Sequence, residues 1–467
     1  MDSVWVVFVI AIGYLAALAV ISFVVRRSSR TSASYTTGGK AFPAVFIGLL
    51  LASEFIGTSA SMGTAQEAFS VGISASWNLV SLGVGFILFS FLLARKFKTL
   101  GENTISGALA RAYGERVRVA TSVIMIAALL IVTIAIYASG GAVLASLLEI
   151  DPAVAVVVTG ALAAIYVAVG GMRSVVYTNL LHAIVMFIGI VISAVVATKN
   201  VGGFGELRAK LPAEMFDWDG VGWAQIMAWM IAGIGATFAT QYVVQAVISV
   251  GDEGKAQRAG FFSAIMLVPY GVLAALVGMC SAVLYPKIES IQAMPAVVVD
   301  MNAVAGGIVI AGLAAAMLGS LAALILGAST LMLKDFYQRF FNRDGDDKKN
   351  VRFIRVATIV AGMLPIPLAL YATDVLTVTF LAKSLRAALA VLVLMMFYAP
   401  RFGSRGGAFA SIIASLLTTI AWFLAGDPYG IDNAYIAVLT PLVIMTISHF
   451  VSKDRANDVR AKVEEPA

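Results

Sequence analysis

Apolar stretches of about 20 residues alternate with short polar or charged segments along almost the entire chain. A helix needs about 20 apolar residues to cross the hydrocarbon core of a bilayer, so each stretch is long enough to span it. The pattern predicts an all-α polytopic membrane protein of about thirteen transmembrane helices. The predicted spans are residues 5–25, 42–64, 72–94, 120–148, 152–169, 176–198, 223–250, 261–284, 305–333, 353–371, 375–396, 408–425 and 434–451.

Basic residues are concentrated in alternate connections between these spans, as the positive-inside rule requires. Arg26 and Arg27 follow the first apolar stretch, whereas a signal peptide carries its positive charge before it, so this stretch is predicted to be a retained span. With the amino terminus outside, 26 of the 32 Lys and Arg residues lie on the inner side. The exceptions are Lys199, Arg208, Lys210 and Lys287 outside, and Lys383 and Arg386 within a span. We expect a multi-pass protein of the plasma membrane, the bacterial inner membrane, with a cytoplasmic carboxyl terminus.

Two inner connections are long, residues 95–118 and 334–355. The first contains a short apolar segment at 105–110, which predicts an interfacial helix. The second contains the charged run 343–349. Both are interpreted as solvated connectors, because runs of charge usually face water.

Composition excludes several classes of protein. Hydrophobic residues make up 60% of the chain and charged residues 12%, whereas soluble domains have roughly 45–50% and about 25%. One cysteine and two histidines exclude an intrachain disulfide, a thiolate metal cluster and His-rich metal chemistry. No Ser/His/Asp or Cys/His set lies at a common depth, so we do not expect an enzyme. The net charge of +6 reflects the inner loops and does not indicate nucleic acid as a partner.

Two predicted spans contain Gly- and hydroxyl-rich segments, at residues 52–63 and 233–242, and they lie five spans apart. Non-helical backbone inside a membrane is tolerated where it lines a protein cavity. Discontinuous helices at corresponding positions of two halves are typical of inverted-repeat transporters, which bind solute and ion at the breaks. Small residues that only allow close helix packing are the alternative.

Three segments resemble a known family. Residues 170–182, GGMRSVVYTNLLH, are similar to its pattern GG-x-x-(A/S)-V-x-x-T-D-x-x-Q. Residues 241–245, QYVVQ, with the charged loop 252–258, resemble its Q-x-x-V-Q-R stretch. Residues 328–337, ASTLMLKDFY, end like its K-D-(I/L)-Y. Together and in this order they make the chain similar to the solute:sodium symporter family, of bacterial type, over residues 13–451.

The resemblance implies a LeuT-type 5+5 inverted repeat that works by alternating access. It divides the chain into a first scaffold span with its inner loop, a first repeat of spans two to six, an outer loop, a second repeat of spans seven to eleven, and two scaffold spans with a cytoplasmic tail. The corresponding ranges are 1–41, 42–198, 199–222, 223–397 and 398–467.

The resemblance also implies a sodium site between the second and ninth spans. Its expected ligands are the carbonyls of Ser53, Ile56 and Ala316 and hydroxyls at Gly319 and Ser320. Gly319 stands where the family has Ser, so one hydroxyl is missing and restoring it should strengthen sodium binding. Asn179 and His182 stand where the family has Asp and Gln, near the expected inner exit of the ion. Sodium, or else a proton, is therefore the expected coupling ion, and no other cofactor is expected.

Glu54 lies inside the break of the second span, where a buried acid is a functional candidate because burying its charge is costly. It can coordinate sodium, carry a proton, or bond the broken backbone as a structural acid. His182 suits a proton relay because its ordinary pKa lies near neutrality, but hydrogen bonding to a neighbouring carbonyl is the favoured interpretation.

Lys383 and Arg386 are three residues apart on one helical face, roughly 13–18 Å from Asp374 and thus near the midplane. The favoured explanation is a paired carboxylate, from Glu54, Glu67 or the substrate, and the alternative is that the two side chains snorkel to an aqueous surface. The aromatic side chains of Phe55, Trp77, Phe238 and Tyr242 can gate or line the pocket, and packing inside the helix bundle is the alternative. The predicted substrate-binding residues are Phe55, Gly57, Trp77, Asn78, Thr237, Gln241, Tyr242, Gln245, Lys383 and Arg386.

The sequence thus predicts a secondary active transporter that couples symport of a small polar organic solute, a carboxylate or amino acid, to sodium or protons. The alternative is a transporter-fold solute sensor that acts with a partner chain. The expected partners are the solute, the coupling cation and the lipid bilayer.

Overall fold

The structure is a computed structural model that describes residues 2–26, 36, 42–148, 150–343, 346–372 and 375–459. Three segments predicted on the inner side lie wholly or partly outside the described residues: 27–41, 343–349 and the tail from 460. Within the described chain there are only helices, turns and two isolated β-bridges. The helices are α1 (Asp2–Arg26), α3 (Ala44–Phe55), α4 (Thr58–Val71), α5 (Trp77–Leu92), α6 (Ala94–Leu100), α7 (Ile105–Tyr113), α8 (Glu115–Leu148), α9 (Pro152–Val201), α10 (Phe204–Lys210), α11 (Trp223–Ala239), α12 (Gln241–Ile248), α13 (Glu253–Leu284), α14 (Ala293–Val299), α15 (Ala303–Leu331), the π-helix η4 (Met332–Phe341), α16 (Asp347–Met363), α17 (Ile366–Ala369), α18 (Val375–Tyr398), α19 (Arg405–Leu424) and α20 (Asn433–Val451), with short 3-10 turns at Gly72–Ser76, Ala213–Phe216, Ser290–Gln292 and Pro428–Gly430.

The helices account for most of the predicted spans. Among the described residues, nine helices are long and apolar enough to cross a membrane, and ten if α11 and α12 form one span bent by 44°. Shorter apolar helices at Ile12–Ile21, Ala44–Phe55 and Pro152–Ala161 fall within three further predicted spans. The exact count of thirteen stays a prediction.

Helix α9 is helical at every residue from Pro152 to Val201, where the sequence predicts two separate spans. Near the start of α9, the side chain of Thr159 lies beside Gly140 of α8, and the side chain of Met317 of α15 lies beside the same glycine. Further along α9, Gly189 lies against Gly312 of α15. A straight helix would separate Thr159 from Gly189 by about 45 Å, whereas Met317 and Gly312 are only about 7.5 Å apart along α15. Helix α9 therefore reverses direction, and the two predicted spans are its two arms.

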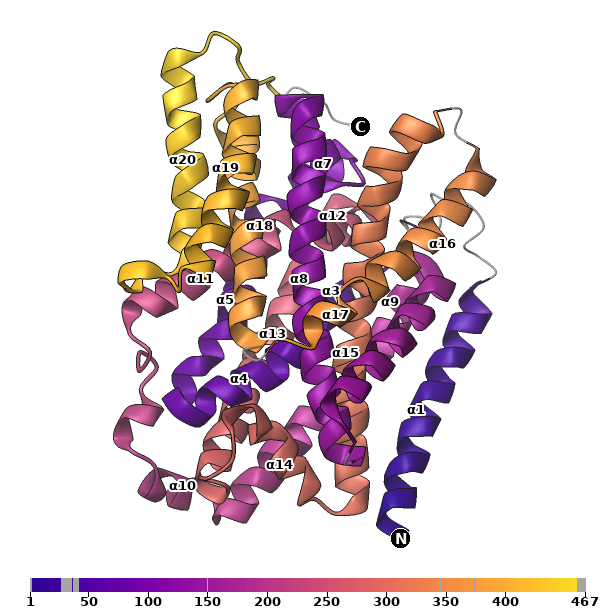
Figure 1. Cartoon of the computed structure of the whole chain (residues 1–467), viewed down its shortest axis with the longest axis vertical. Helices are drawn as coiled ribbons and strands as arrows, with labels where there is room; N and C mark the ends of the chain where they lie inside the picture. Colours follow the sequence, from indigo (N-terminus) through magenta and orange to yellow (C-terminus); the bar gives the residue numbers. More distant parts are fainter. Residues whose placement is uncertain are drawn as a thin grey trace.

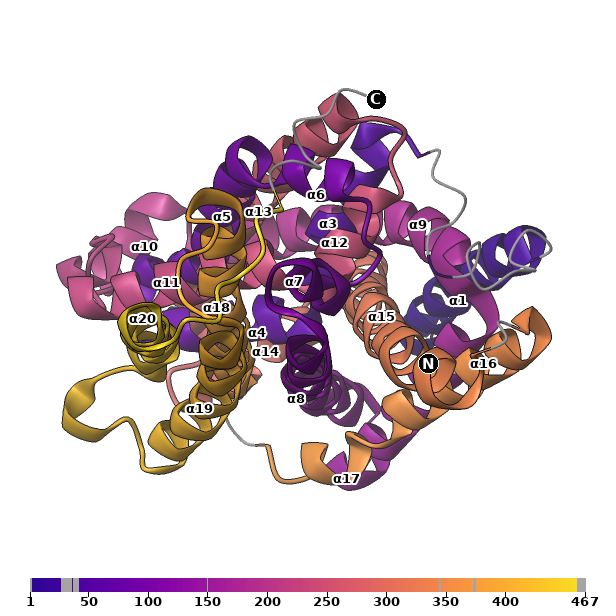
Figure 2. The ribbon, with the colours of Figure 1, turned by 90° about the horizontal axis from the view of Figure 1, so that it is seen from above.

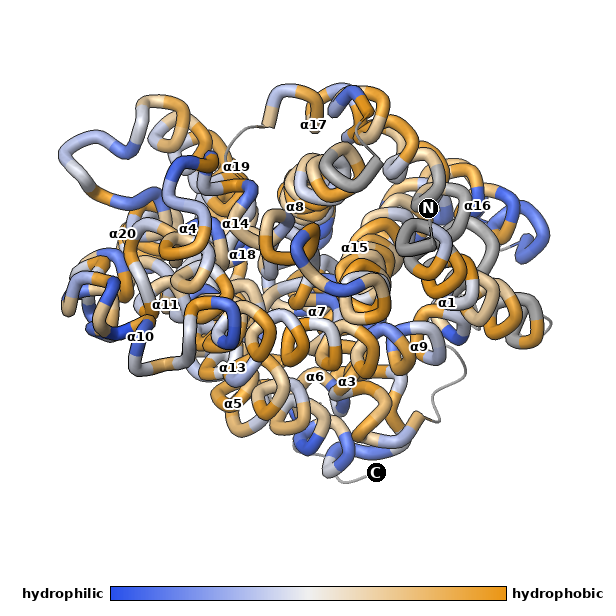
Figure 3. Tube along the Cα trace, turned by 90° about the horizontal axis from the view of Figure 1, so that it is seen from below, coloured by the Kyte–Doolittle hydropathy of each residue, from blue (hydrophilic) through white to orange (hydrophobic). Residues whose placement is uncertain are grey.

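Helix α15 lies near the middle of the molecule and packs against α1, α3, α8, α9 and α16 (Figure 2). Small residues let the helices approach closely, as where Gly312 meets Gly189 and where Gly235 of α11 meets Ala387 of α18. Hydrophobic residues also cover the outer helices, and hydrophilic residues gather in the connections (Figure 3). Apolar surface on the outside as well as the inside is what a bilayer environment requires.

The charged connections predicted to share one side do gather at one end, the upper end of Figure 1, which we call the α7 end. There Lys98 donates to the Val250 carbonyl at 2.6 Å, and the Asn457 amide donates to the Ala112 carbonyl at 2.8 Å. The opposite end carries α10 and α14 and is called the α14 end (Figure 1). The predicted helix at 105–110 is α7, but all six of these residues are buried. The part of the connection that forms α7 is therefore packed into the protein, and its interpretation as solvated is wrong there, whereas Arg95, Arg111 and Arg116 of the same connection are exposed.

Candidate functional site

The second predicted span is discontinuous, as the sequence indicates. Helix α3 ends at Phe55, Ile56 and Gly57 have non-helical backbone, and α4 begins at Thr58. In the described residues no backbone N–H donates to the carbonyl of Ser53 or of Ile56. These two oxygens are among the predicted sodium ligands, and carbonyls released from helical bonding are the ligands that a hard cation prefers.

Helix α15 passes directly beside this break. The Ser320 hydroxyl donates to the Ser53 carbonyl at 3.2 Å, which brings one predicted hydroxyl ligand onto one predicted carbonyl ligand. Ala316, whose carbonyl is the third predicted carbonyl ligand, lies one turn earlier on the same helix and is fully buried. The break and α15 therefore form a buried cluster of neutral oxygen atoms.

Gly319 occupies the centre of this cluster. The Ser53 hydroxyl donates to Asn179 Oδ1 at 2.6 Å, and a Cβ on Gly319 would lie 2.6 Å from Ser53 Oγ and 2.7 Å from Asn179 Oδ1. The space of the missing hydroxyl is thus filled by the Ser53–Asn179 hydrogen bond. The expectation that a serine at this position simply adds a ligand is not supported by this packing.

Replacing Gly319 by Ser or Ala is instead expected to destabilise the protein by about 1–3 kcal/mol, because overpacking forces neighbouring side chains to move. Thermal unfolding of the purified protein and sodium binding measure the two effects. The Ala variant is the matched control, since it adds the Cβ without the hydroxyl. A Ser variant of wild-type stability with tighter sodium binding would restore the original expectation.

Asn179 and His182 follow each other by one turn on α9. Asn179 also donates from Nδ2 to the Val175 carbonyl at 2.9 Å. His182 is fully buried, and its Nδ1 shares a hydrogen bond with the hydroxyl of Tyr14 on α1. For His182 the sequence favours a hydrogen bond to a neighbouring carbonyl, and this is wrong because the partner is the Tyr14 hydroxyl. Tyr14 was missed, and its signal was a polar tip near the middle of an apolar span.

A small cavity lies beside the break, with a volume of about 20 Å³. This volume holds about one water molecule, so the pocket is closed around its side chains. Its lining comes from α3, α4, α8, α12, α15 and α18, with Gly57 at the break, and includes five of the predicted substrate residues. The lining residues are Glu54, Phe55, Gly57, Ser59, Ala60, Val132, Ile136, Tyr242, Ser320, Thr379, Lys383 and Arg386.

Both deep cations face this cavity and are held by neutral groups. Lys383 donates to Asn78 Oδ1 at 2.6 Å and lies 4.2 Å from the centre of the Phe380 ring. Arg386 donates to Thr240 Oγ1 at 3.1 Å. In the described chain neither forms an ion pair with a carboxylate, and Oε2 of Glu54 has no hydrogen-bond partner. Of the three proposed anions, Glu67 lines a different hollow.

Several predicted solute residues lie away from the cavity. Gln241 accepts from the Ile105 amide at 2.9 Å and donates to the Asn103 carbonyl at 3.1 Å. Gln245 donates to Thr36 and Thr330. The two glutamines share a helical face as predicted. That face contacts α15 and the connection that leads into α7, not the cavity. Their prediction as pocket residues is wrong in this structure.

Three other residues that were predicted to line or gate the pocket, Thr237, Trp77 and Phe238, are absent from the lining of the cavity. The Thr237 hydroxyl bonds the carbonyl of Ile234 within its own helix, and Trp77 donates to the Trp218 carbonyl. Phe238 packs against Phe89 and does not line the cavity. The second break itself is confirmed, at Thr240 between α11 and α12.

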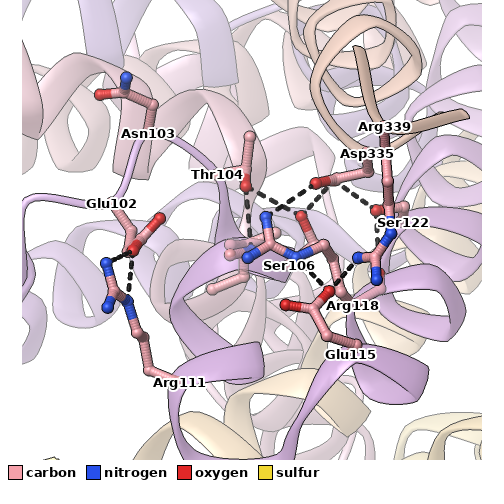
Figure 4. Close-up of polar contacts among 12 residues, drawn as sticks. Glu102, Asn103, Thr104, Ser106, Arg111, Glu115, Arg118, Ser122, Asp335 and Arg339 are labelled. Carbon is pink, nitrogen blue, oxygen red and sulfur yellow. Dashed lines mark hydrogen bonds and ion pairs between the residues drawn. The ribbon is translucent and has the colours of Figure 1, made fainter. Parts of the chain in front are cut away.

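A polar network at the α7 end joins segments far apart in the sequence (Figure 4). Asp335 of η4 is fully buried and accepts from the hydroxyls of Ser106 and Ser122, the latter at 2.6 Å. Arg118 approaches it at 3.4 Å. Arg339, also of η4, pairs with Glu115 of α8. Asp335 belongs to the KDFY segment of the sequence, and nothing in that segment indicated the contacts with Ser106 and Ser122.

Discontinuous membrane helices that meet a central polar cavity are typical of secondary transporters. The family model described as the sodium:solute symporter family matches residues 35–415. The chain therefore belongs to the sodium:solute symporter family and is a multi-pass membrane transporter rather than an enzyme.

Individual proteins agree with this assignment. The osmoregulated proline transporter OpuE of Bacillus subtilis is 23% identical over 438 residues, which cover 90% of this chain and 89% of that protein. The sodium/proline symporter of Staphylococcus aureus is 22% identical over 484 residues, covering 97% and 93%. The solved structure of a Na+-coupled sialic acid symporter has a TM-score of 0.82 at 19% identity and covers 97% of this chain and 99% of that one. At this identity the structural likeness supports the LeuT-type fold.

Proposed function

We propose that the chain carries a small zwitterionic acid, such as an amino acid, together with sodium across the plasma membrane. The observation that carries the proposal is the set of unmatched charges at the cavity, where Lys383 and Arg386 meet no carboxylate partner in the described chain. A solute carboxylate would pair with these cations, and a solute ammonium would pair with Glu54. Two relatives named for proline, which has both groups, support this substrate class.

The decisive experiment is uptake into proteoliposomes with sodium and proton gradients imposed separately. We expect the sodium gradient alone to drive accumulation, and proline and other zwitterionic acids to compete while neutral sugars do not. Uptake driven only by the proton gradient would make Glu54 a proton carrier. No uptake of any zwitterionic acid would reject the substrate class.

Sodium is favoured over a proton because the cluster at the break consists of oxygen atoms without formal charge. The Ser320 hydroxyl is hydrogen-bonded to the Ser53 carbonyl, and the Ser53 hydroxyl is hydrogen-bonded to Asn179. Such oxygens suit a hard monovalent cation. Glu54, the next residue along the chain, adds a carboxylate at the same break.

Ser320→Ala is expected to weaken the sodium affinity of transport about ten- to hundredfold, since a lost contact to a charged group costs roughly 1.5–3 kcal/mol. The sodium concentration at half-maximal uptake measures it. Ser193→Ala is the matched control, because the Ser193 hydroxyl is buried and, among the described residues, donates to the Gly189 carbonyl of its own helix. Equal sodium dependence in both variants would place the ion elsewhere.

We also infer that the α7 end faces the cytoplasm and that the amino terminus is outside. Basic connections gather at the α7 end, whereas α1 begins at the α14 end (Figure 1). Labelling of single cysteines introduced at Asp454 and Asp219 by a membrane-impermeant reagent tests the orientation. In intact cells only the second site should react.

A further inference from the structure

Helix α16 presents three cationic side chains along one exposed face. Lys348, Arg352 and Arg355 follow each other at intervals of four and three residues, which places them on the same side of the helix. All three are exposed and line a hollow of about 400 Å³. The rest of the lining is Asp347, Val351 and Val356. Three cations against one carboxylate leave this face with a net positive charge.

These cations are not used for internal contacts. In the described part of the chain, the side chains of Lys348, Arg352 and Arg355 form no hydrogen bond and no ion pair. The neighbouring Lys349 lies 3.9 Å from Asp346, so the acidic residue before the helix is directed to a different cation. The charge on the three-residue face is therefore available to an external anion.

The same helix continues into an exposed apolar surface. Val356, Ile359, Val360 and Met363 are exposed by between 41% and 55%. From Arg352 to Met363 the helix rises about 16 Å, close to half of the roughly 30 Å thickness of a bilayer core. Cations at one end of an apolar surface of this length match the dimensions of one lipid leaflet.

We propose that this face of α16 is a binding site for an anionic phospholipid. The phosphate lies in the hollow between Lys348, Arg352 and Arg355, and an acyl chain lies along Val356, Ile359, Val360 and Met363. Guanidinium groups suit this ligand because their planar donors bind phosphate oxygens in pairs. A lipid fits better than free phosphate, because only a lipid also covers the apolar surface below the cations.

The proposal does not depend on the transported solute. The cluster lies on α16, and none of its residues lines the central cavity. It concerns a ligand from the surrounding bilayer, so solute recognition and lipid recognition can fail independently.

The test is a titration of the purified full-length protein in detergent with phosphatidylglycerol, phosphatidylcholine or inorganic phosphate. Native mass spectrometry and thermal unfolding report binding. Wild type should bind phosphatidylglycerol more tightly than phosphatidylcholine. Arg352→Gln/Arg355→Gln should weaken phosphatidylglycerol binding about thirtyfold, since each basic residue near an anionic surface contributes a factor of roughly five.

Arg116→Gln/Lys453→Gln is the control of equal charge, because both residues are exposed and lie outside α16. It should bind phosphatidylglycerol like wild type, and the single variant Lys348→Gln should show about a fivefold loss. Equal binding of the two lipids, equal losses in the control, or full competition by inorganic phosphate would each overturn the proposal.

Discussion

Replacing Arg386 by Gln is expected to weaken binding of zwitterionic and anionic solutes about ten- to hundredfold. Arg386 lines the central cavity, and its partners in the described chain are Thr240, the Tyr242 side chain and the Ala382 carbonyl of its own helix, none of them a carboxylate. A solute carboxylate would supply the missing anion, and losing a charge-assisted hydrogen bond costs roughly 1.5–3 kcal/mol. Competition against labelled proline measures the affinity.

The control for this prediction is Arg116→Gln, which removes an exposed arginine at the α7 end. Thermal stability must be measured together with affinity, because Arg386 also donates to Thr240 at the break between α11 and α12. If stability falls for Arg386→Gln and recovers when Glu54→Gln is added, Glu54 is its partner and the solute is not. Wild-type affinity and stability together would show that Arg386 has no part in recognition.

Lys383 should behave differently from Arg386. It is already held by Asn78 Oδ1 and by the face of the Phe380 ring, so part of its charge is compensated inside the protein. Asn78 in turn donates to Thr64 of α4. This chain connects α18 to α4 and α5 beside the cavity, which gives Lys383 a structural role in addition to any contact with solute.

The sequence was most informative where charged residues lie inside apolar spans. Glu54, Lys383 and Arg386 are charged residues in apolar spans, and all three line the cavity. Burying a charge is costly, so such residues indicate a site without any structural information. By contrast, Val132 and Ile136 of α8 also line the cavity but cannot be distinguished from other apolar span residues.

Helical periodicity alone was not enough to place the two glutamines. It shows that Gln241 and Gln245 share a face, but not which neighbour that face meets. The meeting with Ile105 and Asn103 depends on where a connection more than 130 residues earlier folds, and this is a tertiary contact. The hydrogen bond between Tyr14 and His182 has the same origin, since 168 residues separate the two partners.

The connections show a similar limit. A polar segment between two spans is expected to be solvated, yet the part of the 95–118 connection that forms α7 is buried and contacts the buried Asp335. One carboxylate that joins Ser106 of α7, Ser122 of α8 and its own helix η4 can fix these three elements together. No local pattern in the sequence contains this information.

Asp335→Asn is therefore expected to destabilise the protein by roughly 3 kcal/mol, because it breaks a buried charged network. The carboxylate accepts from Ser106, Ser122 and Arg118, whereas an amide has one acceptor oxygen and would direct its NH2 group at one of these donors. Arg118 would keep only Glu115, at 3.1 Å. A lower temperature of thermal unfolding in detergent is the expected result.

Asp219→Asn is the matched control, since Asp219 is exposed in the connection before α11 and should leave stability within about 0.5 kcal/mol of wild type. Ser106→Ala and Ser122→Ala each remove one hydroxyl donor, so each should cost less than Asp335→Asn. If the network fixes α7, single cysteines placed on α7 should also become more reactive in the Asn variant, because its buried residues open to solvent. A variant as stable as wild type, with unchanged cysteine reactivity, would mean that apolar packing of α7 alone holds this end of the protein together.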